Sequence, residues 1–175
     1  MRSRYTGAHV LDVGCGPRGS LEWAHDAGRR VGADPLAARY AKLHSEPQGM
    51  EYVAARAESL PFPDASFDIV GCFNALDHVE DVDRVIVELV RVLAPGGDLL
   101  VVVDIGHDAT ELEPWTFGWD LPDRFPAALE RVRVRHLERV DEAIYVTLEQ
   151  DVPFDHGRND GRRGVLSAWL RRPGP

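Results

Sequence analysis

The residues best placed to do chemistry stand at a glycine-rich turn near the start of the chain. A short apolar run at residues 9–13 is followed directly by three closely spaced glycines, Gly14, Gly16 and Gly19. Glycines between a strand and a helix let the backbone approach a ligand closely. Asp34 ends the next apolar run, where a carboxylate can accept hydrogen bonds from ribose hydroxyls. These residues predict a nucleoside-cofactor site, and a tight turn without a ligand is the alternative.

Two histidines are the candidates for a general base. His78 follows the apolar run at residues 67–73, and His107 follows the run at residues 98–105. If both runs are parallel strands, both histidines lie beyond their carboxyl ends, where open α/β sheets bind ligands. An imidazole there could remove the proton of an acceptor hydroxyl or amine. The alternative for His78 is a structural role at the start of a helix, with the neighbouring Asp77 as its N-cap.

We predict neither a metal site nor a disulfide. Four potential ligands follow one another at a spacing that matches no established metal pattern: His107, Asp108, Glu111 and Glu113. Cys15 and Cys72 are too few and too far apart for a disulfide framework or a zinc site. Both stand in apolar stretches, where a free cysteine behaves as a small core residue.

The order of strand-like and helix-like segments predicts one layered α/β domain. We expect strands at residues 9–13, 29–34, 50–54, 67–73 and 98–105. Helices are expected at residues 17–27, 35–44, 79–93 and 121–131. Two alternating runs, 132–140 and 143–148, are separated by Asp141-Glu142, which suits a tight turn. They predict an antiparallel hairpin after the parallel strands.

Length and charge limit the range of functions. The 175 residues fit one domain, which we expect at residues 1–150, followed by a basic tail at 151–175 that is solvated or binds an anionic partner. A net charge of −9 argues against a nucleic-acid partner. There is no apolar run long enough to span a bilayer and no signal-peptide core, so we expect a cytoplasmic protein without membrane contact.

Five segments between residues 10 and 103 resemble, in order and at similar spacing, the methyltransferase type 11 family of class I S-adenosylmethionine-dependent methyltransferases. They are Leu11-Asp12-Val13-Gly14-Cys15-Gly16, Gly32-Ala33-Asp34, Ala57-Glu58-Ser59-Leu60-Pro61-Phe62-Pro63-Asp64, Ser66-Phe67-Asp68 and Arg91-Val92-Leu93-Ala94-Pro95-Gly96-Gly97. The glycines alone also match the spacing of dinucleotide-binding oxidoreductases. The five segments together favour the methyltransferases.

This resemblance implies a Rossmann-like three-layer sandwich, in which a mostly parallel seven-stranded sheet ends in an antiparallel strand. It implies S-adenosylmethionine as the cofactor, with Asp34 at its ribose and Asn74 near its sulfonium. The implied cofactor site also contains Asp12, Gly14 and Gly16 along the methionine part, Ala57 and Glu58 beside the adenine, and Cys15 and Pro35. Two positions depart from the family pattern, because Arg18 replaces a frequent glycine and Arg56 a frequent aspartate.

The predicted function is therefore methyl transfer to a small-molecule acceptor, on oxygen or nitrogen, with much of the rate supplied by positioning. The alternatives are a noncatalytic cofactor-binding or regulatory partner subunit, a nicotinamide-dependent oxidoreductase and a nucleic-acid methyltransferase. Aromatic residues in the long connection at 104–125 could cover an acceptor or pack the loop. Because the first strand begins near residue 9, we expect an acceptor site that is open, or covered in a homodimer or by a partner subunit.

Overall fold

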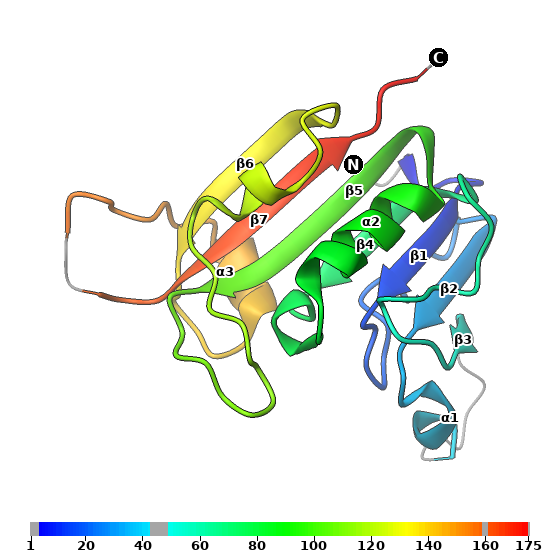
Figure 1. Cartoon of the computed structure of the whole chain (residues 1–175), viewed down its shortest axis with the longest axis horizontal. Helices are drawn as coiled ribbons and strands as arrows, with labels where there is room; N and C mark the ends of the chain where they lie inside the picture. Colours follow the sequence, from blue (N-terminus) through cyan, green and yellow to red (C-terminus); the bar gives the residue numbers. More distant parts are fainter. Residues whose placement is uncertain (1–3, 43–48, 159–160, 175) are drawn as a thin grey trace.

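The fold is an α/β sandwich built on one seven-stranded sheet (Figure 1). A computed structural model describes residues 4–42, 49–158 and 161–174. The strands lie in the order β3-β2-β1-β4-β5-β7-β6. Their bounds are β1 His9–Val13, β2 Arg29–Ala33, β3 Glu51–Val53, β4 Phe67–Phe73, β5 Leu93–Ile105, β6 Glu130–Glu138 and β7 Gly164–Arg171. The first five pair in parallel and β7 is antiparallel to both of its neighbours, which confirms the predicted fold class.

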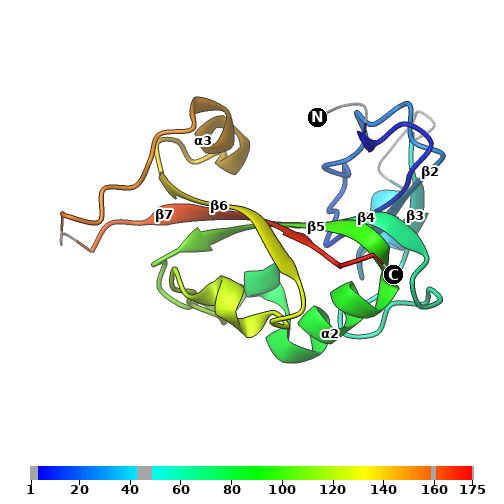
Figure 2. The same ribbon diagram turned by 90° about the horizontal axis from the view of Figure 1, so that it is seen from above.

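The two faces of the sheet carry different elements (Figure 2). Helix α2 (Val82–Val92) covers one face, and helix α3 (Ile144–Gln150) lies on the opposite face. The buried residues of α2 recur every three or four positions, as expected for an amphipathic helix on a sheet. The side chain of Asp81 caps α2 by accepting a hydrogen bond from the backbone N–H of Arg84 at 3.0 Å. This helix confirms the prediction at 79–93 apart from its first residues.

The other predicted helices are shorter than expected or did not form. Residues 17–27 make successive turns, in which the backbone N–H of Ser20 donates to the Asp12 carboxylate at 2.5 Å instead of to a helical carbonyl. Helix α1 is limited to Ala37–Tyr40, and residues 43–44 of the predicted helix lie outside the described residues. Of the helix predicted at 121–131, only the 3₁₀ turn η3 (Leu121–Arg124) forms; Pro126, which disfavours a helical conformation before it, follows closely. A second 3₁₀ turn, η2 (Leu76–His78), joins β4 to α2.

The predicted hairpin exists, but its second strand was assigned to the wrong residues. Residues 144–150 form α3, in which Ile144 and Thr147 are buried at helical spacing. The second strand is β7, and it lies inside the segment that we expected to be a basic tail. It pairs along both of its edges, with β5 and with β6. The prediction of a separate tail was therefore wrong. It gave more weight to the arginines that flank this apolar run than to the run itself.

Two of those arginines hold β7 in place by ion pairs at its ends. The Arg162 guanidinium lies 2.7 Å from the Glu138 carboxylate, and Arg171 lies 2.9 Å from Asp98. Their charges are thus compensated within the domain. No helix among the described residues is long and apolar enough to cross a membrane.

Candidate active site

A cavity of about 530 Å³ opens beyond the carboxyl ends of β1, β2 and β4. This is the edge at which open α/β sheets bind ligands, and the volume is in the range of small-molecule sites. Most of the predicted site residues line it, namely Gly14, Gly16, Asp34, Pro35, Ala57, Glu58, Asn74 and His78. The structure therefore gathers residues from four separate segments around one space.

Gly14 and Gly16, in the turn after β1, have different structural roles. Both have positive φ, +71° at Gly14 and +61° at Gly16, a conformation that side chains other than glycine rarely adopt. A Cβ at Gly14 would lie 2.3 Å from the Cβ of Ala75, so this glycine lets the turn pack against the segment after β4. A Cβ at Gly16 would meet nothing within 4 Å. Gly16 thus leaves room at the cavity wall.

Asp34 fixes the turn to the end of β2. Its carboxylate accepts hydrogen bonds from the backbone N–H of Gly16 at 3.1 Å and of Leu36 at 2.8 Å. Each bond uses a different oxygen, so each oxygen keeps further acceptor capacity toward the cavity. Leu36 and Tyr40, from the segment after β2, also line this part of the wall. The sequence analysis missed both, because neither residue type signals a ligand.

Asp12 and Cys15 support the turn from behind and do not line the cavity. Asp12 is fully buried. Burial raises the pKa of its carboxyl to about 7, although hydrogen bonds from the backbone N–H groups of Ser20 and Leu21 lower it. Its second oxygen, Oδ1, has no hydrogen-bond partner. Burial likewise raises the pKa of the Cys15 thiol to about 12. Both side chains stay largely uncharged below neutral pH.

The opposite wall comes from the segment after β3 and is fixed by hydrogen bonds at its rim. The Glu58 carboxylate accepts a hydrogen bond from the backbone N–H of Glu80 at 2.8 Å. Arg56, which departs from the family pattern, makes an ion pair with the side chain of Glu80 at 2.7 Å. Burial would raise the pKa of Glu58, but the backbone hydrogen bonds and nearby Arg56 lower it. Glu58 is therefore an anion that holds the rim together.

Asn74 presents an unused acceptor to the cavity. Its backbone N–H donates to the carbonyl of Val102 at 2.7 Å, and its φ is +51°. Its side-chain Oδ1 is buried and has no hydrogen-bond partner. Asparagine tolerates this left-handed conformation better than most residues. A buried acceptor in a cavity wall is a group that a ligand donor would satisfy.

His78 and His107 lie on either side of the buried Asp77, but only His78 lines the cavity. The distance from His78 Nε2 to Asp77 Oδ1 is 3.8 Å, and from His107 Nε2 to Asp77 Oδ2 it is 3.6 Å. His107 is 4% exposed, so the prediction that it faces an acceptor was wrong. Asp77 is not an N-cap of α2, since Asp81 has that role. The sequence alone could not show that Asp77 faces both rings.

The aromatic residues after β5 pack the loop. The indole N–H of Trp115 donates to the carbonyl of Val79 at 2.8 Å, and Phe117 and Phe125 are both buried in the main core. Trp119 stacks on His136 with ring centroids 4.4 Å apart. Of the two interpretations left open by the sequence, packing is the one that these contacts support.

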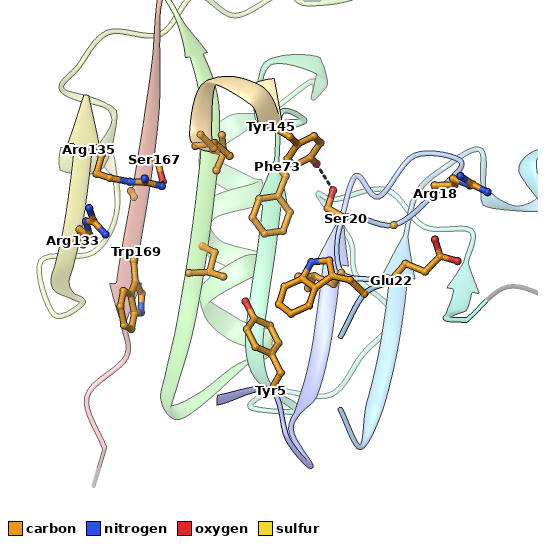
Figure 3. A pocket seen from close by; sticks show the side chains of 17 residues that line it. Tyr5, Arg18, Ser20, Glu22, Phe73, Arg133, Arg135, Tyr145, Ser167 and Trp169 are labelled. Carbon is orange, nitrogen blue, oxygen red and sulfur yellow. Dashed lines mark hydrogen bonds between the residues drawn. The ribbon is translucent and has the colours of Figure 1, made fainter. Parts of the chain in front are cut away.

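A second cavity, of about 600 Å³, lies on the sheet face opposite α2 (Figure 3). Phe73 from β4 and Trp169 from β7 line it from the sheet, with Tyr5 on a third side. A hydrogen bond between the hydroxyls of Ser20 and Tyr145 links the turn after β1 to α3 at one end. This cavity shares no lining residue with the first, and the sequence analysis did not predict it.

The strand order, the glycine turn and the acidic residue at the end of β2 define a class I, Rossmann-like nucleoside-cofactor fold. The family model of the methyltransferase domain matches residues 11–101. The chain therefore belongs to this family of S-adenosylmethionine-dependent methyltransferases, and S-adenosylmethionine is the cofactor of the family.

Individual relatives agree with the family. The chain is 35% identical to a probable S-adenosylmethionine-dependent methyltransferase of Mycolicibacterium smegmatis over 87% of this chain and 69% of that protein. It is 49% identical to the ubiquinone/menaquinone biosynthesis C-methyltransferase UbiE of Hahella chejuensis, over 34% of this chain and 24% of that protein. Several of the curated relatives are thus matched over less than half of their length. The crystal structure of the [4+2]-cyclase SpnF superimposes with a TM-score of 0.70 at 21% identity, covering 99% of this chain and 79% of that one. That likeness concerns the fold alone.

Proposed function

We propose that this chain transfers the methyl group of S-adenosylmethionine to a small-molecule acceptor held beyond the carboxyl ends of β4 and β5. The observation that carries the proposal is the single cavity joining the glycine turn, Asp34, Asn74 and His78. The glycine turn, Asp34 and Asn74 suit the cofactor, and His78 suits an acceptor beside it. The family supports the reaction class, and the cavity supports this location for it.

The cavity residues fit the cofactor. Gly16 leaves open space at the wall, and Asp34 keeps acceptor capacity for ribose hydroxyls. The unpartnered Oδ1 of Asn74 can accept a hydrogen bond from a bound ligand. Gly14 and Gly16 would lie along the methionine part, Pro35 beside the ribose, and Ala57 and Glu58 beside the adenine. Asp12 and Cys15 would support this site indirectly.

His78 is the residue we assign to proton removal from an acceptor hydroxyl or amine. Its Nδ1 lies 3.0 Å from the carbonyl of Leu112, which can only accept, so Nδ1 carries the proton. In the neutral ring, Nε2 is then free to accept a proton. The carboxylates of Asp77 and Glu113 each lie 3.8 Å from Nε2 and would stabilise the imidazolium that forms. When bound, S-adenosylmethionine supplies an electrophilic methyl group, and the protein positions the acceptor for it.

The acceptor atom follows from this assignment. A base beside the acceptor favours oxygen or nitrogen, which must lose a proton on methylation. The name of the Hahella relative shows that carbon is an acceptor elsewhere in the family.

A net charge of −9 favours a small molecule over a nucleic acid. We place the reaction in the cytoplasm. We also propose that a second copy or a partner subunit covers the acceptor site beside His78.

The proposal is tested first by cofactor binding. Isothermal titration of the full chain should show binding of S-adenosylmethionine and its demethylated product in preference to NAD. Asp34→Ala should weaken this binding by about 1.5–3 kcal/mol, because hydrogen bonds to a charged acceptor are lost. Asp26→Ala removes the same charge at an exposed position and should leave binding unchanged. Tight NAD binding without any response to the sulfonium compound would contradict the assignment.

Transfer itself is tested with labelled S-adenosylmethionine and a panel of hydroxyl, amine and carboxyl acceptors. We expect label to move to at least one acceptor, with the demethylated cofactor as the second product. An intact cofactor site without transfer to any acceptor would favour the alternative of a noncatalytic or regulatory partner subunit.

A further inference from the structure

Two buried side-chain atoms beside η2 have no hydrogen-bond partner. They are Asp77 Oδ1 and His107 Nε2, and the latter lies 3.6 Å from the other carboxylate oxygen of Asp77. Asp77 is 1% exposed, and its ion-pair partners among the described residues are histidines. Buried polar atoms without partners are rare in folded proteins, and each calls for an explanation. A bound cation is one group that would satisfy the unpartnered carboxylate oxygen of Asp77.

The orientation of His78 adds a further acceptor. Because Nδ1 donates to the carbonyl of Leu112, the neutral ring directs an Nε2 lone pair away from that bond. Nε2 lies 3.8 Å from Asp77 Oδ1 and 3.8 Å from Glu113 Oε1. These distances exceed those of a hydrogen bond. Two carboxylates and an imidazole lone pair therefore face one another with no donor between them.

We propose that Asp77, His78 and Glu113 form a binding site for a divalent cation. Their ligand atoms lie within 4.8 Å of one another, a separation that modest side-chain movement would close around an ion. The bond from His78 Nδ1–H to a backbone carbonyl is the type of contact that orients metal-binding histidines. Two carboxylate oxygens and one imidazole nitrogen suit ions such as Mn²⁺ and Zn²⁺. The buried Asp77 Oδ1 supplies the charge that the ion would balance.

The site borders the cavity described above, since His78 lines that cavity. An ion held there would be within reach of an acceptor oxygen and would lower the pKa of an acceptor hydroxyl. In that state the ion would favour the ionised acceptor, and the acceptor proton would pass to solvent, because Nε2 of His78 would be occupied as a ligand. This consequence rests on the proposed methyl transfer, whereas cation binding itself does not. The two can therefore be tested separately.

The decisive measurement is Mn²⁺ binding to the full chain without cofactor, monitored by the electron paramagnetic resonance signal of the free ion. Competition with Zn²⁺ is then measured in the same way. We expect one Mn²⁺ per chain, displaced by Zn²⁺. Glu113→Gln and Asp77→Asn should each weaken binding at least tenfold. Glu111→Gln is the matched control, because it removes an equal charge from an exposed position of the same loop and should leave binding unchanged.

Two results would overturn the proposal. One is the absence of Mn²⁺ and Zn²⁺ binding to the unaltered chain. The other is equal binding by the Glu113→Gln and Glu111→Gln variants. Glu113 is only partly buried, so its variant tests the site even if Asp77→Asn fails to fold. Titration with S-adenosylmethionine keeps the outcomes apart, because cofactor binding without cation binding contradicts the cation site alone.

Discussion

Among the individual residues, His78 has the most direct part in the proposed reaction. Its ring is fixed by Leu112, lines the cavity and lies near two carboxylates, whereas the bond between Asp34 and Gly16 that suits the cofactor does not involve it. His78→Ala should lower turnover by about 10²-fold, with cofactor affinity almost unchanged. Steady-state kinetics and titration together check this, with the exposed His9→Ala as control. A fall of only a few-fold would mean that positioning supplies the catalysis.

Asp12 is the residue that should give the fold a measurable pH dependence. Burial raises its pKa in the folded state to about 7 from 3.8, so ionisation is easier in the unfolded chain. Its contribution to stability is then full below pH about 4 and is lost as the pH rises to about 7, by up to about 4 kcal/mol. Urea unfolding between pH 4 and 8 should show this loss, and Asp12→Asn should flatten it. Equal slopes in both proteins would show that the carboxyl ionises without cost.

At the scale of elements, β7 distinguishes a domain strand from a tail. Leu166 is fully buried in β7 between β5 and β6. Leu166→Ala should therefore cost about 2–5 kcal/mol of unfolding free energy, from lost burial and the cavity left behind. The same truncation at the exposed Leu112 should stay within about 0.5 kcal/mol. Denaturant midpoints measure both. A negligible effect at Leu166 would support the prediction that residues 151–175 form a solvated tail.

The turn segment after β1 shows how a tertiary contact replaces a local preference. Pro17 suits the first turn of a helix, and a helix is predicted at residues 17–27. In the structure the N–H of Ser20 bonds to the buried Asp12, and the N–H of Gly19 bonds to the Tyr52 hydroxyl at 3.1 Å. These bonds satisfy the backbone without a helix. The segment instead forms one wall of the second cavity (Figure 3).

For the whole molecule, charge sets the expected partners. The net charge is −9, and arginines near the C-terminal end are engaged, with Arg171 bound to Asp98 and Arg162 to Glu138. Duplex DNA or RNA should therefore bind poorly at physiological salt. Fluorescence anisotropy at two salt concentrations tests this expectation. A low-micromolar complex that weakens steeply with salt would show a basic surface and would favour a nucleic-acid substrate.

The sequence by itself determined the fold class, the glycine turn and Asp34, because each depends on periodicity or spacing within a short segment. Strands β1 and β4 lie where the apolar runs placed them, and the cavity collects Ala57 and Asn74 as the family resemblance implied. Those signals are local, so they can be read without knowing which segments meet.

Only the tertiary structure decided the position of β7 and the surroundings of Asp77. An apolar run among arginines becomes an inner strand because β5 and β6 offer it two edges. Asp77 faces both histidines because β4 and β5 end side by side and the loop after β5 returns Glu113 to the same place. Apart from the neighbouring pair Asp77 and His78, these contacts join residues far apart in the chain, so their spacing in the sequence does not indicate them.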